Sequence, residues 1–189
     1  LVFEAAIDRA GMLRVNTLQE LFLAAQTLSR FRTNVDDTIT ILTNGGGAGV
    51  MAADAAAYAG VKLTTFSDAT LQKLDAVLPP NWSHGNPADI IGDAPVTRYE
   101  QALQILNDDP ATGAILFIHA PTAIVSSAEI ARALVPLSTH SAVTPPRLMS
   151  AWLGDHAVAE ARQTFQDAGI ANFDTPEQAV RAFSMLVRY

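Results

Sequence analysis

Residues 38–58 read TITILTNGGGAGVMAADAAAY, and this stretch decides the fold. Its first six residues, Thr38–Thr43, are mostly β-branched and predict a strand. The alanine-rich segment Gly49–Tyr58 predicts a helix that ends at Gly60. Four of the five positions between 45 and 49 are glycine. A strand that passes through a glycine turn into a helix is typical of α/β proteins.

The same alternation continues to the end of the chain. Further strands are predicted at residues 62–66, 114–119, 148–153 and 170–173, and helices at 67–78, 96–107, 126 onward, 156–168 and 175 onward. Five strands separated by helices predict a parallel sheet covered on both faces, because right-handed crossovers leave few other arrangements. We therefore expect an α/β, flavodoxin-like, doubly wound five-stranded sheet with a ligand crevice at the carboxyl ends of its strands.

The first 33 residues precede this pattern. They predict a helix over Val2–Ala10, a short strand over Met12–Val15 and a second helix after the capping box Thr17–Glu20. The polar segment 33–37 breaks the pattern, so a boundary is expected there. The main domain is accordingly predicted over 38–189. Because the chain starts at Leu1, inside a helical pattern without a cap, we interpret it as a piece of a longer protein.

Composition excludes several classes of function. With 189 residues, 49% of them hydrophobic, the chain can bury a core. Its net charge of −7 disfavours an extended electrostatic binding surface for nucleic acid. The absence of cysteine excludes a disulfide scaffold, a Cys-ligated zinc site and a thiol nucleophile. No histidine pair has the spacing of helical metal ligands, so no metal site is expected. No apolar run reaches the ~18 residues of a membrane span, and no signal-peptide pattern is present, so we expect a cytoplasmic protein.

The glycine segment is the strongest candidate binding site. Its backbone N–H groups can converge at the positive end of a helix, which suits a phosphate or carboxylate. The candidate phosphate-binding residues are Asn44, Gly45, Gly46, Gly47, Ala48 and Gly49. The alternative is a turn that only permits close packing of strand and helix. A dinucleotide pattern through Gly47, Gly49 and Ala52, with Asp68 downstream, is a remote third interpretation.

Two further segments follow strands and are expected to line the crevice. The candidate crevice-lining residues are Asn86, Asp89, His119, Pro121 and Thr122. Each has a structural alternative, because an Asn-Pro-Ala-Asp run can be a simple turn and a histidine that ends a buried strand is usually a core residue. The other three histidines are not expected to take part in chemistry: His84 and His140 are expected to be solvent-exposed, and His156 starts a helix.

These motifs together resemble a known family. Residues 43–55, 86–94 and 117–123 are similar to the glycine loop, the Asn-Pro-Val-Asp segment and the third turn of the NDP-forming acyl-CoA synthetases, relatives of succinyl-CoA synthetase. Ala88 departs from the valine of that second motif, and the third turn departs from the usual Thr-Pro-Gln-Ala. Residues 3–15 match the segment that precedes this domain in the family.

The resemblance implies an activity and an organisation. These enzymes convert acyl-CoA, ADP and phosphate to the free acid, CoA and ATP, through a phosphorylated histidine. Two glycine-capped helix N-termini hold that histidine, and Gly45–Gly49 would be one of them. The histidine itself would lie upstream of Leu1, so the isolated chain is expected to be inactive. Residues 1–33 would be the C-terminal tail of a preceding flavodoxin-like domain.

The resemblance also implies partners and one alternative. This domain alone would bind phosphate and no cofactor, whereas CoA, ATP or ADP and Mg would be bound in the full-length protein. A CoA-binding Rossmann domain, a first flavodoxin-like domain and an ATP-grasp domain would be its neighbours, and homo-oligomerisation stays open. The alternative is the acyl-CoA-sensing, non-catalytic region of a GNAT-family protein lysine acetyltransferase, which the C-terminal residues 182–189 resemble at least as well.

Overall fold

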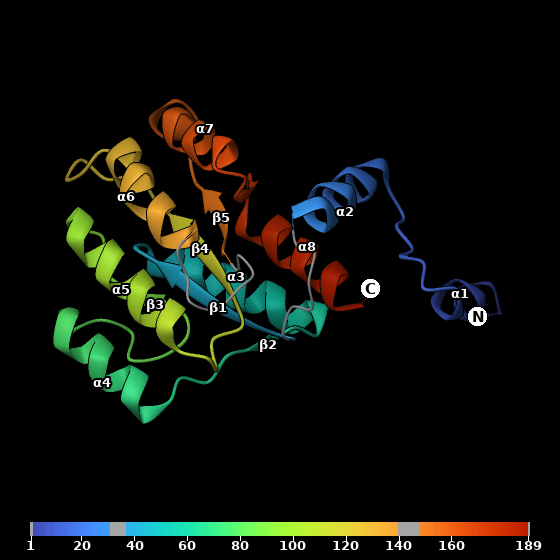
Figure 1. Cartoon of the computed structure of the whole chain (residues 1–189), viewed down its shortest axis with the longest axis horizontal. Helices are drawn as coiled ribbons and strands as arrows, with labels where there is room; N and C mark the ends of the chain where they lie inside the picture. The colour runs from blue at the N-terminus through green and yellow to red at the C-terminus, as the bar shows by residue number, and fades with distance from the viewer. Residues whose placement is uncertain (1, 31–36, 140–147, 189) are drawn as a thin grey trace.

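The computed structural model describes residues 2–30, 37–139 and 148–188. Its centre is a parallel sheet in the order β2-β1-β4-β5-β6, with the short strand β3 added to β1 (Figure 1). The strands are β1 (Thr38–Thr43), β2 (Lys62–Leu63), β3 (Ala88–Asp89), β4 (Ala114–His119), β5 (Leu148–Trp152) and β6 (Ala171–Phe173). The α/β doubly wound fold expected from the alternating pattern is confirmed.

Helices cover both faces of the sheet (Figure 1). One face packs against α4 (Asp68–Val77), α5 (Val96–Asp108), α6 (Ser127–Thr139) and α7 (Ala159–Asp167), and the other against α3 (Gly46–Ala59) and α8 (Pro176–Arg188). Side chains of β1 alternate between the two cores, because successive residues of a strand point to opposite faces. Ile39 and Ile41 meet Ala52 and Ala56 of α3, whereas Leu42 lies in the other core.

Several elements differ from those expected. The two-residue β3 was not expected, because it falls in the segment read as a turn, and the strand expected over 62–66 is paired only at 62–63. The strand expected over Met12–Val15 is absent, since these residues have no regular structure. The polar boundary at 33–37 and His140 fall mostly or wholly outside the described residues.

Asn86 explains why two short strands can share one edge of β1. β2 pairs with Thr38 and Ile39, and β3 pairs with Leu42 and Thr43. Between them, the Asn86 side chain accepts from the N–H of Ile41 at 2.9 Å and donates to the carbonyl of Ile39 at 2.9 Å. It also donates to the carbonyl of Thr64 at 3.0 Å. The amide thus replaces the missing strand backbone, because buried peptide groups must be hydrogen-bonded.

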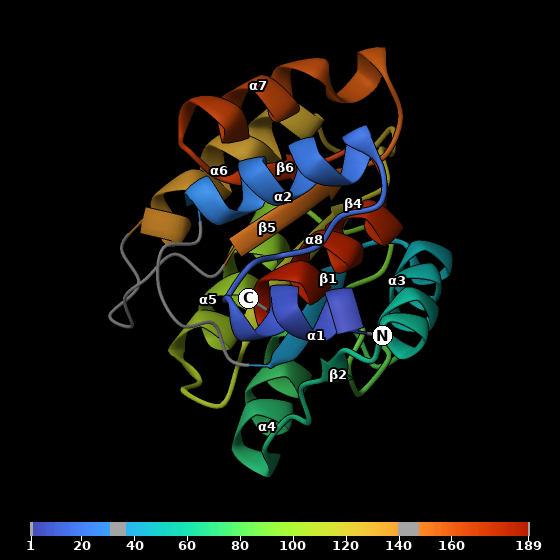
Figure 2. The same ribbon diagram turned by 90° about the vertical axis from the view of Figure 1, so that its right-hand side faces the viewer.

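The N-terminal helices form an outer layer beside α8. α2 (Leu18–Arg30) packs on α8, where Glu20 pairs with Arg181. The Gln26 amide of α2 also donates to the carbonyl of Asn172 in β6 at 3.3 Å. The N–H of Asn16 and the Arg181 guanidinium lower the pKa of the Glu20 carboxyl. α1 (Val2–Arg9) lies apart from the sheet (Figure 1), and in the perpendicular view it lies in front of α8 (Figure 2). α2 is thus tied to the main domain, and α1 extends from it.

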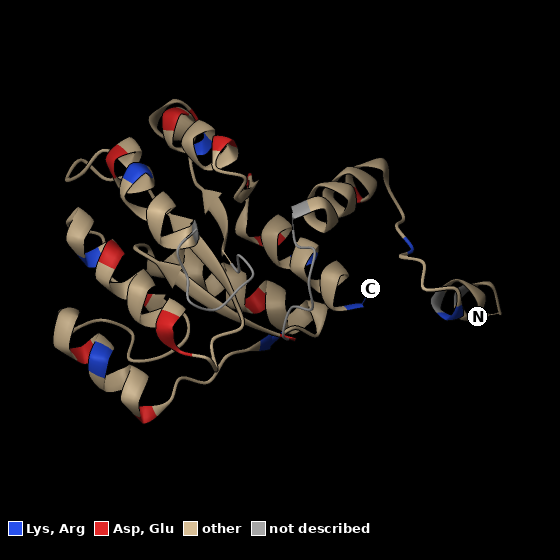
Figure 3. Ribbon diagram, in the orientation of Figure 1, with Lys and Arg blue, Asp and Glu red and all other residues tan. Residues whose placement is uncertain are grey.

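Charges are interspersed over the outer helices. Each of α4, α5, α6 and α7 carries both acidic and basic residues, so basic side chains form no continuous stripe along these four helices (Figure 3). None of the helices in residues 2–30, 37–139 and 148–188 combines the length and the apolar character needed to cross a bilayer.

Candidate functional site

The candidate site lies where the carboxyl ends of β1, β3 and β4 meet. These strands are parallel, so the segments that follow them emerge at the same edge of the sheet. The glycine segment follows β1, Asp89 ends β3, and Ala120 follows β4. The structure thus brings together one residue from each of the three motifs singled out in the sequence.

The helix after β1 begins earlier than the sequence suggested. It starts at Gly46, three residues before the expected Gly49, so the glycines form its first turn. Gly45 is the extended N-cap, and its carbonyl accepts from the N–H groups of Ala48 at 3.0 Å and Gly49 at 3.2 Å. These two N–H groups are therefore used inside the helix. Those of Gly46 and Gly47 donate to no group in the part of the chain that the structure describes.

The two open amides lie at the start of a helix of 14 residues. The first N–H groups of a helix have no partner within it, and the helix dipole adds partial positive charge at this end. Gly45 offers no side chain to cap them. An anion can therefore accept from Gly46 and Gly47, and their lack of side chains leaves the approach open.

Asn44 fixes the position of this turn. Its side chain is buried, accepts from the N–H of Ala120 at 2.9 Å and donates to the carbonyl of Ala120 at 2.8 Å. These reciprocal bonds extend the β1–β4 pairing one step beyond the strand ends. The Thr43 hydroxyl also accepts from the N–H of Gly45 at 3.0 Å. Asn44 therefore positions the glycine turn, with both the oxygen and the nitrogen of its amide bonded to Ala120.

The presence of glycine has a different structural explanation at each position of this segment. A Cβ atom at Gly49 would lie 3.0 Å from Thr43 Cγ2 and 3.2 Å from Pro87 Cβ, so glycine permits close packing of α3 on β1. A Cβ atom at Gly45 would lie 3.2 Å from Ala120 Cβ. At Gly47 nothing lies within 4 Å of such an atom. The packing alternative thus accounts for Gly45 and Gly49, and it leaves Gly47 unexplained.

Asp89 places a carboxylate beside the open amides. A Cβ atom at Gly46 would lie 2.8 Å from Asp89 Oδ2, and Asp89 Oδ1 accepts from the N–H of Ile91 at 2.9 Å. Ile91 has a φ of 68°, a left-handed conformation that is rare for a β-branched residue. Such backbone strain persists where the surroundings enforce it and is common near functional sites. Here the Asp89 side chain is part of what holds the turn.

His119 is a core residue and does not line an open crevice. Its side chain is fully buried, lies 5.0 Å from the Trp152 ring between centroids, and pairs through Nε2 with the Ser127 hydroxyl at 3.1 Å. Burial lowers the pKa of His119 to about 4. The ring is therefore neutral at physiological pH, and its Nδ1 has no partner in the described chain.

The remaining predicted residues divide between the crevice and the scaffold. Pro121 is exposed and Thr122 half-buried in the loop after β4, where the Thr122 hydroxyl accepts from the N–H of Ile124 at 3.4 Å. The Asn86 amide forms its hydrogen bonds with the backbone of Ile39, Ile41 and Thr64 at the edge of β1. Asp68, considered for a dinucleotide, is the first residue of α4.

The sequence interpretation missed the role of the loop between α4 and β3. His84, expected to be merely exposed, is hydrogen-bonded to Asp75 and Pro80, and the Ser83 hydroxyl bridges Pro87 and Asp89. These contacts join residues of a helix and an irregular loop. No periodic pattern marks such pairs, so the sequence offered no signal for them.

The hollow that includes part of α3 lies away from the glycine turn. A hollow of about 310 Å³ lies at the opposite end of α3, where Tyr58, Arg181 and Arg188 are among its lining residues. Within residues 2–30, 37–139 and 148–188, no three His, Asp or Glu side chains are grouped as metal ligands would be. The donors at the site are therefore backbone amides.

Comparison with known proteins gives a consistent family. Residues 39–187 match the family model described as the Ligase-CoA domain. The chain is 36% identical over 187 residues to the ADP-forming acetate–CoA ligase I of Archaeoglobus fulgidus, covering 99% of the chain and 26% of that relative. It is 33% identical over 189 residues to the alpha subunit of the ADP-forming acetate–CoA ligase I of Pyrococcus furiosus, covering 40% of that subunit.

A solved structure agrees with these matches. The dinucleotide-forming acetyl-coenzyme A synthetase 1 of Candidatus Korarchaeum cryptofilum, in complex with phosphate and ADP, superposes with a TM-score of 0.90 at 28% identity. The superposition covers 100% of this chain and 40% of that one. The chain therefore spans between about a quarter and two-fifths of the length of these relatives.

Substitution of the glycines by alanine separates packing from ligand access. Gly49→Ala should lower the free energy of unfolding by about 1–3 kcal/mol, because the new methyl group would press on Thr43 and Pro87. Gly47→Ala should raise it by about 0.5 kcal/mol, because Gly47 is helical, its surroundings are open and alanine loses less conformational entropy on folding than glycine. Urea unfolding measures both. Equal destabilisation by the two substitutions would show that Gly47 is also a packing residue.

His119 should make the chain sensitive to acid. Its folded-state pKa of about 4 lies below the ordinary 6.5, so the unfolded chain binds the extra proton first. The contribution is complete above pH 6.5 and is lost as the pH falls toward 4, by roughly 3 kcal/mol in total. Urea unfolding of His119→Leu at pH 7 and pH 5 should show a weaker pH dependence than the unmodified chain. The same substitution at the exposed His156 is the control, and identical slopes for His119→Leu and the unmodified chain would contradict the assignment.

Proposed function

This chain belongs to the Ligase-CoA domain family, and from that premise we propose that it is the phosphoryl-docking domain of an ADP-forming acyl-CoA synthetase. In this proposal a histidine of another segment carries the phosphoryl group. The N-terminus of α3 receives it through the N–H groups of Gly46 and Gly47. The complete protein would convert acyl-CoA, ADP and phosphate to the free acid, CoA and ATP.

The single observation that carries the proposal is the pair of open amides at Gly46 and Gly47. Preorganised backbone donors stabilise charge that develops on a transferring phosphoryl group without having to reorganise during the reaction. The start of a helix adds its dipole to these donors. Glycine at position 47 has no packing reason within the described chain, and a closely approaching ligand would supply one.

Asp89 limits how an anion can bind here. Its carboxylate already lies beside Gly46, so a phosphoryl group would approach from the Gly47 side of the helix start. Two negative groups this close repel one another, which raises the cost of holding the phosphoryl group. Docking would therefore be reversible, as a site that receives and releases a phosphoryl group requires.

Other domains of the same protein are the proposed partners. The relatives are two and a half to four times longer than the match, which leaves room for CoA-binding and nucleotide-binding domains. CoA, the adenine nucleotide and Mg²⁺ are assigned to those domains, because the donors at the α3 site are backbone amides. The apolar side chains Phe3 and Phe22 are 68% and 70% exposed, which favours α1 and α2 as surfaces that another domain covers.

The alternative proposal is a regulatory region of a GNAT-family lysine acetyltransferase. It would use the same amides to bind an acyl-CoA phosphate and would transfer no phosphoryl group. The relatives reported above are named as CoA ligases or synthetases, which favours the first proposal. A full-length protein that acetylates lysine and never forms an acid-labile phosphoprotein would favour the second.

A bulky residue at position 47 should abolish phosphoryl transfer without unfolding the protein. Gly47→Val in the full-length protein should remove ATP-dependent formation of phosphohistidine, because its methyl groups would occupy the approach to the amides. Labelling with radioactive ATP, read as acid-labile phosphoprotein, measures the effect.

Ala57→Val is the matched control, because Ala57 is exposed in the same helix. Both variants should unfold at similar urea concentrations. Phosphohistidine formation at the unmodified rate in Gly47→Val would contradict the docking role of α3.

Asp89→Asn should strengthen binding of inorganic phosphate to this chain. The amide oxygen can still accept from the N–H of Ile91, and the negative charge beside Gly46 is removed. We expect the affinity to rise by a factor of about three to ten, with a larger effect at low salt. Isothermal titration calorimetry at two salt concentrations measures this. Weaker binding by the variant would mean that Asp89 contributes to the ligand contact itself.

A further inference from the structure

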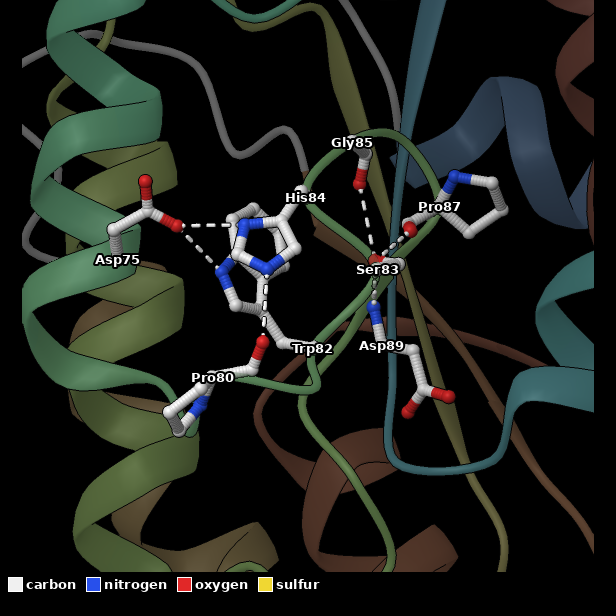
Figure 4. Close-up of polar contacts among 8 residues, drawn as sticks. All are labelled: Asp75, Pro80, Trp82, Ser83, His84, Gly85, Pro87 and Asp89. Carbon is white, nitrogen blue, oxygen red and sulfur yellow. Dashed lines mark hydrogen bonds and ion pairs between the residues drawn. The ribbon is translucent and has the colours of Figure 1, made fainter.

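A hydrogen-bonded cluster ties the loop before β3 to helix α4 (Figure 4). Asp75 Oδ1, on α4, accepts from Trp82 Nε1 at 2.7 Å and pairs with His84 Nδ1 at 2.8 Å. His84 Nε2 pairs with the carbonyl oxygen of Pro80 at 3.0 Å. The Trp82 side chain is buried in the larger core, so the cluster is anchored at one end.

The two partners of His84 determine its protonation state. A carbonyl oxygen and a carboxylate are both acceptors and have no proton to give. Asp75 Oδ1 already accepts from the indole N–H of Trp82. A neutral imidazole has only one N–H group, so it can satisfy one of the two partners, whereas an imidazolium satisfies both. The geometry therefore favours the form of His84 that carries two protons.

The cluster is linked to Asp89 through Ser83. The Ser83 hydroxyl donates to the carbonyl of Pro87 at 2.6 Å and accepts from the N–H of Asp89 at 2.9 Å (Figure 4). His84 follows directly in the chain and has a φ of 50°, a left-handed conformation that its two ring contacts help to hold. A short chain of contacts thus runs from Asp75 through residues 83–84 to the backbone of Asp89, whose carboxylate lies beside Gly46.

We propose that His84 is a positioning residue which, as an imidazolium, fastens residues 80–89 to α4 and so sets the place of Asp89 beside the open amides of α3. The inference deepens the proposed function, because Asp89 and the amides belong to the docking site. It assigns His84 no contact with a substrate. Its role is to keep the Asp89 carboxylate at the side of Gly46, which leaves the Gly47 side for the phosphoryl group.

Charge and exposure fit this role. The Pro80 carbonyl, together with the Asp75 carboxylate, raises the pKa of His84 above the ordinary 6.5, against the effect of desolvation. Asp75, on α4, is the one charged side chain that pairs with the ring among residues 37–139. The His84 and Asp75 side chains are 54% and 49% exposed, so a proton can exchange freely with water. The fastening is complete at low pH and is lost as the pH rises through the raised pKa.

Nuclear magnetic resonance on the unmodified chain tests the proposal directly. Ring nitrogen shifts report how many protons His84 carries, and carbon-detected shifts report the Asp89 carboxyl carbon and the backbone of Gly46. We expect a titration midpoint above 6.5, with both ring nitrogens protonated below that midpoint. The Asp89 and Gly46 signals should follow the same midpoint. The exposed ring of His156 supplies the internal reference in the same spectra.

Two variants separate positioning from general stability. His84→Asn keeps a residue that tolerates left-handed backbone but cannot bond Asp75 and Pro80 at once. The pH response of Asp89 and Gly46 over the His84 titration range should be lost in this variant. His156→Asn makes the same chemical change at an exposed site and should leave that response intact.

Each outcome decides the proposal. A His84 titration midpoint at or below 6.5 would overturn it, as would Asp89 and Gly46 signals that do not follow the His84 titration. Neither result depends on a variant that must fold. The same data distinguish this inference from the proposed function: if the coupling is seen and Gly47→Val still forms phosphohistidine, the positioning stands and the docking role fails.

Discussion

The reciprocal bonds between the Asn44 side chain and the Ala120 backbone are the constraint on which the rest of the site depends. They prolong the pairing of β1 and β4 beyond the strands and force the chain to turn at Gly45. The turn starts α3 immediately, with its first two amides open. Asn86 makes a similar substitution on the other edge of β1. Two asparagine side chains thus complete the hydrogen bonding along the two edges of β1, because each supplies a donor and an acceptor in the geometry of a peptide group.

The site that results is made of backbone and is poor in side-chain chemistry. Its donors are amides at a helix start, and its one charged neighbour is Asp89, which is held by its own bond to Ile91. Such a site can stabilise an anion through its backbone amides, and the Asp89 carboxylate beside it is held by the turn. The proposed role, in which the domain receives a phosphoryl group from a residue elsewhere, uses these amides as preorganised donors.

The alternation of elements could be predicted from sequence, because period and glycine breaks mark parallel α/β units. The helix start at Gly46 could not, since three glycines predict a loop by propensity and become helical only because the Asn44 bonds and the Gly45 carbonyl close the turn. β3 was missed because two residues carry no pattern. His119 was placed correctly at a strand end, yet its burial among Phe117 and Trp152 depends on neighbouring strands. His84 is exposed as predicted, but its bonds to Asp75 and Pro80 could not be predicted because Asp75 lies on another element.

The proposed docking role requires that the N–H groups of Gly46 and Gly47 bind an anion. Titration of the isotope-labelled chain with inorganic phosphate, followed by amide proton and nitrogen shifts near pH 6.5, measures this most directly. The account predicts saturable shifts that are largest at Gly46 and Gly47, small at Ala48 and Gly49, whose N–H groups bond to Gly45, and absent at the far end of α3. Shifts that are no larger at Gly46 and Gly47 than over the rest of the surface would contradict it.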